Sequence, residues 1–461
     1  MNYLEIAQKY KDEFLMDLTG LLSIPSILNE EDKVVGAPFG IECQRALEYM
    51  MNLGIKYGFS VNNIDGYALS ITYGEQDDSI GILSHLDVVP AGKGWTSNPF
   101  CTTIRDGYLF ARGVLDDKGP AMMSLYALRI IKEYNIKLNK KVVLIFGLDE
   151  ESEMRCMNYY TEHASIPSCG FVPDADFPLI YGEKGIMTIK LSKCIDLPIV
   201  EFNVGERVNV VIGEALCVLK EWQDDYSTLF EYYIDSNHLD GEVSIDDRGF
   251  ASVKIIGKYA HAMEPYKGVN AGYHMLNFIA STYHNDDLME YVKLLEDYRG
   301  TNLNINYEGN YMGDLTMNLG IINYTNNTLN TFINIRYPNE MDAITIINKL
   351  KQSVSSSCSV ELVDDSKPLF VDPNSELVLD LMDSYRAYSD DNYSRPKTIG
   401  GGTYARKLEN FIPFGPEFPH ANDNLNFEVG KCHQANEGFK IDDMFKAIAI
   451  YALAIEKIGG K

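Results

Sequence analysis

Residues of the types that bind zinc occur in short segments spread over the whole chain. His85 and Asp87 lie in GILSHLDVVPAGKGW, and His433 lies near the other end of the chain, in GKCHQANEGF. Carboxylates lie between them, in LDDKG, LDEESE and VPDADFP: Asp116, Asp117, Asp149, Glu150, Glu151, Asp174 and Asp176. Histidine nitrogens and carboxylate oxygens bind zinc at about 2.0–2.2 Å. The set suffices for two zinc ions and leaves one carboxylate for proton transfer.

Several of these residues come directly after strand-like runs. His85 ends SIGILSH, Glu150 and Glu151 follow KVVLIFGL, and Asp174 follows GFVP. In open α/β sheets, ligands gather at the carboxyl ends of the strands. Paired metal ions about 3.5–4 Å apart act together on one substrate, and they need a bridging carboxylate. Asp116 is suited to bridge them, because it lies in a tight turn just before a predicted helix.

The elements that must position these residues have a recognisable pattern. ALSITYG (68–74), SIGILSH (79–85) and KVVLIFGL (141–148) predict strands, and PAMMSLYALRIIKEYN (120–135) predicts a helix. Asp106-Gly107 predicts a turn between two short strands. The alternation of strands and helices predicts an α/β catalytic domain, in which helices flank a mixed sheet.

The pattern of predicted strands and helices changes between residues 186 and 368. Strand-like runs such as IMTIKLSKC and TFINIRYP alternate there with helices predicted near 269–283 and 341–353. After residue 370 the pattern of the first 183 residues returns, with helices predicted at SELVLDLMDSYRAYS and DDMFKAIAIYALAIEKI. We therefore predict one catalytic domain, 1–183 and 370–461, interrupted by an inserted α+β lid domain, 184–369.

The bulk composition excludes some classes of partner. The formal net charge is -26, from 66 acidic and 40 basic residues, which disfavours binding to nucleic acid or to acidic membranes. The N-terminal segment predicts an amphipathic helix instead of a signal peptide, and no apolar run approaches the length of about 18 residues that spans a membrane. The eight cysteines are scattered without a CxxC pair, as in a reduced, cytoplasmic protein.

Eight motifs between residues 84 and 438 together resemble a known family. They are SHLDVVPAGKGW, ARGVLDDKGP, LDEESE, VPDADFPLIYGEKG, YAHAMEPYKGVNA, NIRYP, IGGGTYAR and CHQANEG. In this respect the chain resembles the two-zinc metallopeptidases that include aminoacylases, desuccinylases, glutamate carboxypeptidases and dipeptidases. The resemblance is closest to the PepV-type dipeptidases of bacteria.

The resemblance implies a role for each metal-binding residue. His85 and Asp174 would hold one zinc ion, Glu151 and His433 the other, and Asp116 would bridge the two in a co-catalytic dinuclear site. Neither the residues nor the resemblance fixes the metal, because a site of histidines and carboxylates also accepts Mn²⁺ or Co²⁺.

The resemblance also implies roles for residues that do not bind metal. Asp87 would orient His85, and Glu150 would act as the general base. His261, in the inserted domain, would stabilise the oxyanion. The predicted substrate contacts are Arg406, Asn209, Arg336 and Gly401, the last within Gly400–Gly402, where backbone can approach a ligand closely.

These assignments predict a zinc-dependent dipeptidase, a peptide hydrolase acting on short peptides with a free N-terminus, including β-Ala-Xaa. In smaller relatives a partner subunit supplies the oxyanion histidine; here the enlarged inserted domain supplies it, so we expect a monomer. Asp176 or a nearby acidic residue is a candidate partner for the substrate amine. The alternatives are an N-acyl amino acid deacylase or desuccinylase, which would share every metal residue, and a catalytically silent binding relative.

Overall fold

The computed structural model describes residues 1–423 and 425–461. The chain divides into two compact units, which are described separately below. Unit 1 contains Met1–Tyr181, Phe370–Lys397 and Thr403–Lys461, and unit 2 contains Gly182–Leu369 and Thr398–Gly402. The short segment Thr398–Gly402 thus groups with unit 2, whereas the sequence placed it with the catalytic domain.

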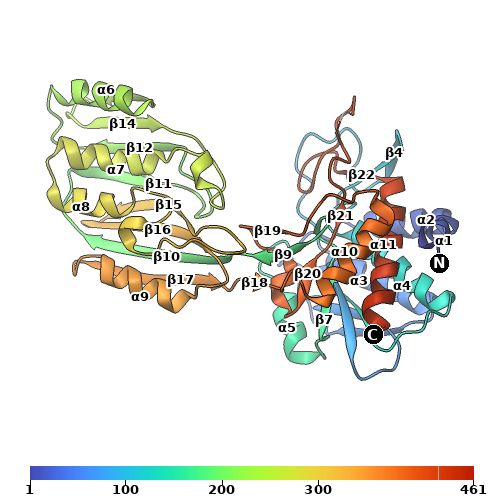
Figure 1. The fold of residues 1–461 in the computed structure, drawn as a ribbon. Helices are drawn as coiled ribbons and strands as arrows, with labels where there is room; N and C mark the ends of the chain where they lie inside the picture. Colours follow the sequence, from blue (N-terminus) through green and yellow to red (C-terminus); the bar gives the residue numbers. More distant parts are fainter. Residues whose placement is uncertain (424) are drawn as a thin grey trace. The chain divides into compact units, whose positions relative to one another are not determined.

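Unit 1 is built on a six-stranded mixed sheet with strand order β1-β2-β6-β3-β7-β20. Figure 1 labels β7 and β20 of this sheet. Its strands are β1 Ser60–Ile64, β2 Ala68–Tyr73, β3 Ser79–His85, β6 Lys141–Gly147, β7 Cys169–Val172 and β20 Phe411–Pro413. The pairs β6/β3, β3/β7 and β7/β20 are parallel, whereas β1/β2 and β2/β6 are antiparallel. Every residue of β3 is buried, as expected for a strand covered on both faces. The predicted fold class is confirmed.

Helices flank this sheet. They are α1 Tyr3–Lys9, α2 Lys11–Leu22, α3 Ile41–Lys56, α4 Lys118–Glu133, α5 Arg155–His163, α10 Glu376–Ser389 and α11 Ile441–Gly459, with a short 3-10 helix, η3 Tyr404–Lys407. α4 and α11 pack against each other and against β3 and β6, while α3 packs on β1 and β2. α4 is buried on nearly all sides, which matches its apolar sequence.

The N-terminal segment forms two helices, although the sequence indicated a single one. α1 ends at Lys9 and α2 begins at Lys11, so Tyr10 lies at the break. The Tyr10 hydroxyl donates to Glu133 Oε2 at 2.5 Å, and the Arg129 guanidinium lies 4.7 Å from the Tyr10 ring centre. These contacts with α4 hold Tyr10 at the break, and a local periodicity cannot indicate them.

Three small sheets complete the strand inventory. The first joins β22 Gly438–Lys440, β5 Tyr108–Phe110 and β4 Thr103–Arg105, and the second pairs β21 Pro416–Glu417 with β8 Ala175–Asp176. The third contains β18 Leu369–Phe370, β9 Ile180–Glu183 and β19 Lys397–Ile399. Three of the four points where the chain passes between the units lie in these strands, and the fourth is between Gly402 and Thr403. Asp106 and Gly107, with φ of 51° and 79°, form the predicted turn between β4 and β5.

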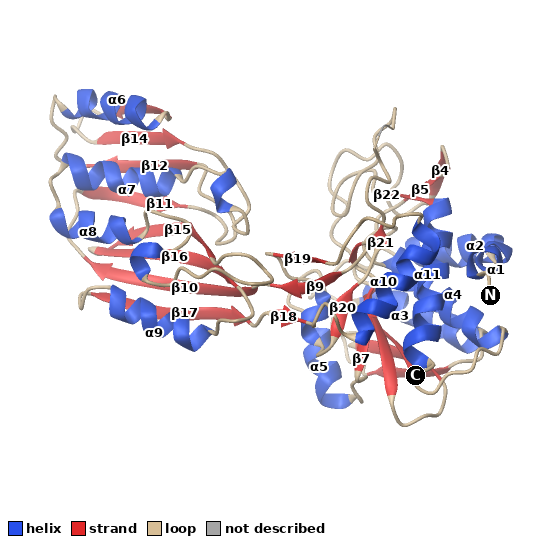
Figure 2. Cartoon of the chain, viewed as in Figure 1, coloured by secondary structure: helices blue, strands red, loops and turns tan. Residues whose placement is uncertain are grey.

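Unit 2 is an eight-stranded antiparallel sheet with helices over one face (Figure 2). The strand order is β13-β14-β12-β11-β15-β16-β10-β17. The strands are β10 Gly185–Cys194, β11 Ile199–Val204, β12 Glu214–Leu219, β13 Asp240–Ile245, β14 Ala251–Ile256, β15 Thr316–Thr325, β16 Thr328–Tyr337 and β17 Cys358–Ser366. The helices are α6 Tyr226–Asn237, α7 Ala271–Thr282, α8 Asp286–Leu294 and α9 Ala343–Ser353, with 3-10 helices η1 Pro265–Lys267 and η2 Thr301–Leu303.

The core of unit 2 lies between this sheet and its helices. Alternate residues of β10 and β14 are buried, which is the pattern of strands with one covered face. Phe278 and Ile279 of α7 pack in the same apolar cluster as Ile189 of β10 and Val253 of β14. Within the described residues of either unit, no helix is both long and apolar enough to cross a membrane.

Candidate metal centre

Three neighbouring strands bring their carboxyl ends to one edge of the unit 1 sheet. β6, β3 and β7 are adjacent and parallel, so the residues that follow them lie close together. His85 is the last residue of β3, Glu150 and Glu151 follow β6, and Asp174 follows β7. The sequence placed these residues at strand ends, and the sheet order makes the ends neighbours.

The ligand-type atoms form a first group around His85. His85 Nε2 lies 3.0 Å from Asp116 Oδ1 and 3.7 Å from Asp174 Oδ2. One ligand atom from each of these three residues lies within 4.8 Å of the others. His85 is fully buried, whereas Asp116 and Asp174 remain slightly accessible. The group can therefore surround one metal ion and remain open on one side.

A second group forms around His433 and shares Asp116 with the first. His433 Nε2 lies 3.0 Å from Asp116 Oδ2 and 3.0 Å from Glu151 Oε2. Asp116 thus turns one carboxylate oxygen to each histidine. This is the arrangement that a bridging ligand between two cations requires.

Bound metal ions explain the arrangement of these donor atoms better than contacts within the protein do. His85 Nε2 is buried and makes no hydrogen bond, even though carboxylate oxygens are close. Burial, together with the negative charge of Asp116, raises the pKa of Asp174 to about 7. A cation among these carboxylates would give the buried His85 Nε2 a partner. It would also reduce the repulsion between Asp116 and Asp174.

Hydrogen bonds around His85 fix its tautomer. Nδ1 lies 3.0 Å from the backbone oxygen of Asp87, which can only accept, so Nδ1 carries the proton and Nε2 keeps its lone pair. The His85 backbone N–H donates to Asp117 Oδ2 at 3.0 Å. The peptide bond between Asp116 and Asp117 is cis.

Asp87 lies beside the second ring nitrogen of His85, as the sequence suggested, but its carboxylate makes no hydrogen bond to that nitrogen. Its carboxylate Oδ1 is 3.4 Å from His85 Nδ1 and makes no hydrogen bond. The other oxygen, Oδ2, accepts the backbone N–H of Glu151 at 3.1 Å. The backbone of Asp87 therefore orients the His85 ring, and its carboxylate positions the segment that carries Glu150 and Glu151.

Glu150 lies beside the two groups without belonging to either. Among the described residues its carboxylate makes no hydrogen bond or ion pair. Burial raises the pKa of Glu150 well above its usual range, and Asp174 and Glu151 raise it further. A carboxyl with a raised pKa in a cleft is suited to accept and return protons near neutral pH.

Glu437 is a positioning residue that the sequence reasoning missed. Its Oε1 accepts backbone N–H groups from Gly113 at 3.1 Å and Leu115 at 2.8 Å, and Oε2 accepts Arg112 Nη1 at 2.5 Å. The carboxylate thereby holds the turn that presents Asp116. Its only signal was an acidic residue within CHQANEG, close to His433.

The predicted substrate residues divide between the units. Arg406 lies in η3 of unit 1. Asn209, His261, Arg336 and Gly401 lie in unit 2. Their roles stay predictions.

Within unit 2, His261 has a defined proton position. Val210 and His261 form an isolated β-bridge, and the Asn209 backbone oxygen accepts the Ala262 N–H at 2.9 Å. His261 Nδ1 accepts the Met263 N–H at 3.1 Å, so in the neutral ring the proton is on Nε2. Burial lowers the pKa of His261, and Arg336 lowers it further. A neutral ring with Nε2–H free to donate suits the predicted oxyanion role.

Arg336 is buried in β16. Its Nε donates to Asn334 Oδ1 at 2.6 Å, and Nη1 donates to the Gly400 backbone oxygen at 3.1 Å. A Cβ at Gly400 would approach Met263 Cβ to 3.0 Å, whereas a Cβ at Gly401 would meet nothing nearer than 3.8 Å. Within unit 2, the backbone of Gly400 thus lies close to Met263, whereas Gly401 has more space around it.

Comparison with known proteins agrees with this geometry. The profile of peptidase family M20/M25/M40 matches residues 81–457. The chain belongs to this family. The resemblance to a metal-dependent peptidase family is thereby confirmed, and so is the expectation of an enzyme that hydrolyses peptides.

Relatives match the chain over nearly its full length. A Staphylococcus aureus (strain USA300) protein with a provisional dipeptidase name is 36% identical, covering 98% of this chain and 98% of its own. Aminoacylhistidine dipeptidase from Vibrio alginolyticus has a similar fold, with a TM-score of 0.56, 13% identity and coverage of 96% of both chains. Human carnosine dipeptidase 1 gives a TM-score of 0.54, 13% identity, and coverage of 99% of this chain and 98% of its own.

Proposed function

We propose that the protein is a dipeptidase that hydrolyses the peptide bond of short peptides with a free N-terminus, with two zinc ions bound per chain. The observation that carries the proposal is the sharing of Asp116 between the two ligand groups, with Glu150 left outside both. In such a site, one carboxylate bridges and a separate one is available for proton transfer. The dipeptidase names of several relatives support the choice of substrate class.

The residues would divide the work as follows. His85 and Asp174 would hold one ion, Glu151 and His433 would hold the other, and Asp116 would be their shared ligand. The bound ions would supply polarisation of the scissile carbonyl and a lowered pKa of water. Mn²⁺ or Co²⁺ would fit the same ligands.

Glu150 takes a proton from the attacking water as the oxygen bonds to the scissile carbon. It then gives that proton to the leaving amine as the C–N bond breaks. His261, through its Nε2–H, would donate to the oxyanion, and Arg406 is suited to bind a substrate carboxylate. The roles of Asn209, Arg336 and Gly401 are proposed as contacts to the substrate. Unit 2 would then act as the lid domain of a monomeric, cytoplasmic enzyme.

The substrate panel that tests this proposal is Ala-Ala, β-Ala-His, Ala-Ala-Ala and N-acetyl-Ala, assayed with Zn²⁺ or Mn²⁺ by release of free amino acid. We expect cleavage of the two dipeptides and little of the others. Cleavage of N-acetyl-Ala in preference to Ala-Ala would instead support the deacylase alternative. A protein that binds metal and cleaves nothing would support the silent-relative alternative.

A further inference from the structure

A cavity of about 410 Å³ in unit 1 adjoins the metal centre. Leu115, directly before Asp116, lines it, as does Asp176, two residues after Asp174. The rest of its wall comes from Phe177, Lys397, β21, the segment 418–423, Lys431 and β22. Its volume is within the range of about 300–1,000 Å³ that is usual for small-ligand sites. A substrate held at the metal centre would have this space beside it.

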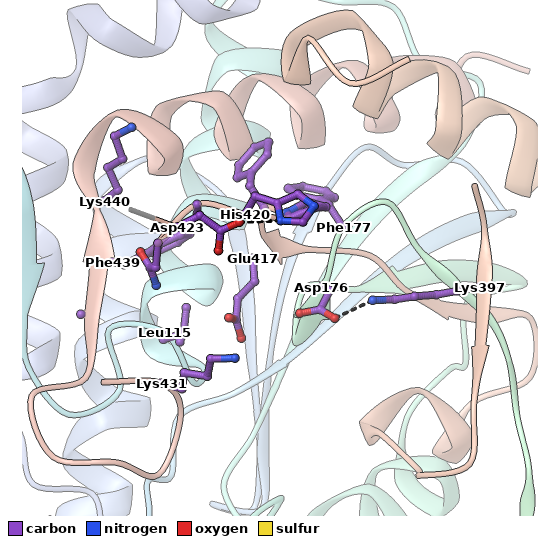
Figure 3. Close-up of a pocket in the computed structure, with 15 residues that line it drawn as sticks. Leu115, Asp176, Phe177, Lys397, Glu417, His420, Asp423, Lys431, Phe439 and Lys440 are labelled. Atoms are coloured by element: carbon purple, nitrogen blue, oxygen red, sulfur yellow. Dashed lines mark hydrogen bonds and ion pairs between the residues drawn. The ribbon is translucent and has the colours of Figure 1, made fainter. Parts of the chain in front are cut away.

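Two carboxylates face the cavity from adjacent strands, and only one is already paired. β8 and β21 are parallel, with Glu417 opposite Asp176. Asp176 Oδ2 lies 2.5 Å from Lys397 Nζ, and Figure 3 shows this pair. Within residues 1–423 and 425–461, the Glu417 carboxylate makes no hydrogen bond or ion pair. Figure 3 shows its side chain directed between Leu115 and Asp176.

The remaining charged groups of the cavity do not neutralise Glu417 by contact. His420 Nδ1 lies 2.8 Å from Asp423 Oδ2, and both side chains are largely exposed, at 82% and 62%. Lys431, which is exposed, and Lys440 each contribute a positive charge to the same cavity. Burial and the negative charge of Asp176 nevertheless outweigh the charge of Lys431, so the pKa of Glu417 is raised to about 7. A poorly solvated carboxylate of this kind gains more from a cationic partner than an exposed one does.

Part of the remaining wall is apolar. Phe177, Phe418 and Phe439 line it, and Leu115 closes the side next to the metal centre. The lining therefore combines one carboxylate that has no contact partner with surfaces suited to a hydrocarbon skeleton. A carboxylate without a contact partner attracts the ammonium group of a dipeptide and not its C-terminal carboxylate, so we place the amine side of the substrate in this cavity.

We propose that Glu417 is a specificity-determining residue, which pairs with a primary ammonium on the substrate residue at the amine side of the scissile bond. This inference rests on the proposed dipeptidase function and deepens it. It assigns the amine-binding role to Glu417 on β21 in place of Asp176, because Asp176 is already paired with Lys397. The ammonium is the N-terminal amine or, in a lysyl substrate, the side-chain amine.

The test compares Glu417→Gln with Glu409→Gln on matched substrates. Both variants remove one negative charge from unit 1, but Glu409 is exposed and does not line the cavity. Ala-Ala is compared with propionyl-Ala, which has the same skeleton without the amine. Lys-Ala is compared with norleucyl-Ala, which lacks only the side-chain amine.

Glu417→Gln is expected to lower kcat/KM for Ala-Ala about 10- to 100-fold, because a hydrogen-bonded charge pair is lost. The loss should come mainly from KM, and propionyl-Ala should be unaffected. Glu409→Gln should change kcat/KM for every substrate by less than about threefold, as is usual for an exposed surface substitution. A loss confined to Lys-Ala would assign Glu417 to the side-chain amine and would also support the proposal.

The proposal is overturned if Glu417→Gln matches Glu409→Gln on all four substrates. It is also overturned, without any variant, if the wild-type enzyme cleaves each amine-bearing substrate no faster than its amine-free partner. That second comparison decides the matter even if Glu417→Gln does not fold. A wild-type protein that cleaves none of the four substrates would instead overturn the proposed function itself.

Discussion

Replacement of Glu150 by glutamine separates proton transfer from metal binding. Glutamine has nearly the same shape but cannot accept the proton of an attacking water. Because Glu150 makes no hydrogen bond or ion pair among the described residues, the substitution breaks no contact. Because Glu150 is in neither ligand group, metal content should stay at the wild-type level.

The expected loss is in kcat. General acid–base catalysis contributes about 10²- to 10⁴-fold, which corresponds to about 3–5.5 kcal/mol of activation free energy. We expect a fall of that size in kcat for Ala-Ala, measured by initial rates at saturating substrate. The unfolding temperature should not fall, because the change removes a negative charge that Asp174 and Glu151 already oppose.

Glu153→Gln is the matched control. Glu153 belongs to the same segment, but its side chain is 74% exposed and lies 3.8 Å from Arg155 Nε, so its replacement should leave kcat unchanged. A Glu150→Gln enzyme that keeps its metal and turns over within about tenfold of wild type would refute the assignment of Glu150 as the base. Loss of metal from this variant would place Glu150 among the ligands instead.

Four further predictions follow from the site. Glu151→Ala should lower bound metal from two ions per chain to one, by elemental analysis, since it removes a ligand of the His433 group; unchanged stoichiometry would contradict this. His261→Ala should lower kcat and leave metal content intact, whereas wild-type kcat would exclude the oxyanion role. Glu437→Ala should lower the free energy of unfolding by about 3–5 kcal/mol, measured by denaturant titration, because it removes the ion-pair partner of buried Arg112. A loss below about 1 kcal/mol would argue against the positioning role of Glu437. In chelated protein, the unfolding temperature should fall as the pH is raised from 5 to 7. In the folded protein Asp174 and Glu417 keep their protons up to a pKa of about 7, while the unfolded chain releases them nearer pH 4. A rise of the unfolding temperature over that interval would be inconsistent with these pKa values.

Much of unit 1 could be predicted because local patterns determine it. The strands at 68–73, 79–85 and 141–147 and the helix at 118–133 agree with their apolar periodicity to within about two residues. The turn at Asp106-Gly107 has the positive φ values that this dipeptide favours. Residues at strand ends were therefore identifiable before the order of the strands in the sheet was known.

Tertiary contacts explain what the sequence did not predict. The break at Tyr10 depends on Arg129 and Glu133, which are far from it in the chain. The role of Glu437 depends on the turn at 113–116, and the importance of Glu417 depends on its register with Asp176. For Asp87, residue type suggested a carboxylate contact to His85, but the backbone oxygen makes that contact. None of these pairings leaves a periodic or local signal.

The most direct measurement is a titration of the metal-free protein with Zn²⁺ while Ala-Ala hydrolysis is followed. The account predicts no hydrolysis by the chelated protein and a rate that rises until two equivalents per chain are bound. Full activity in the chelated protein, or a metal-loaded protein that cleaves no free-amine dipeptide, would contradict the account.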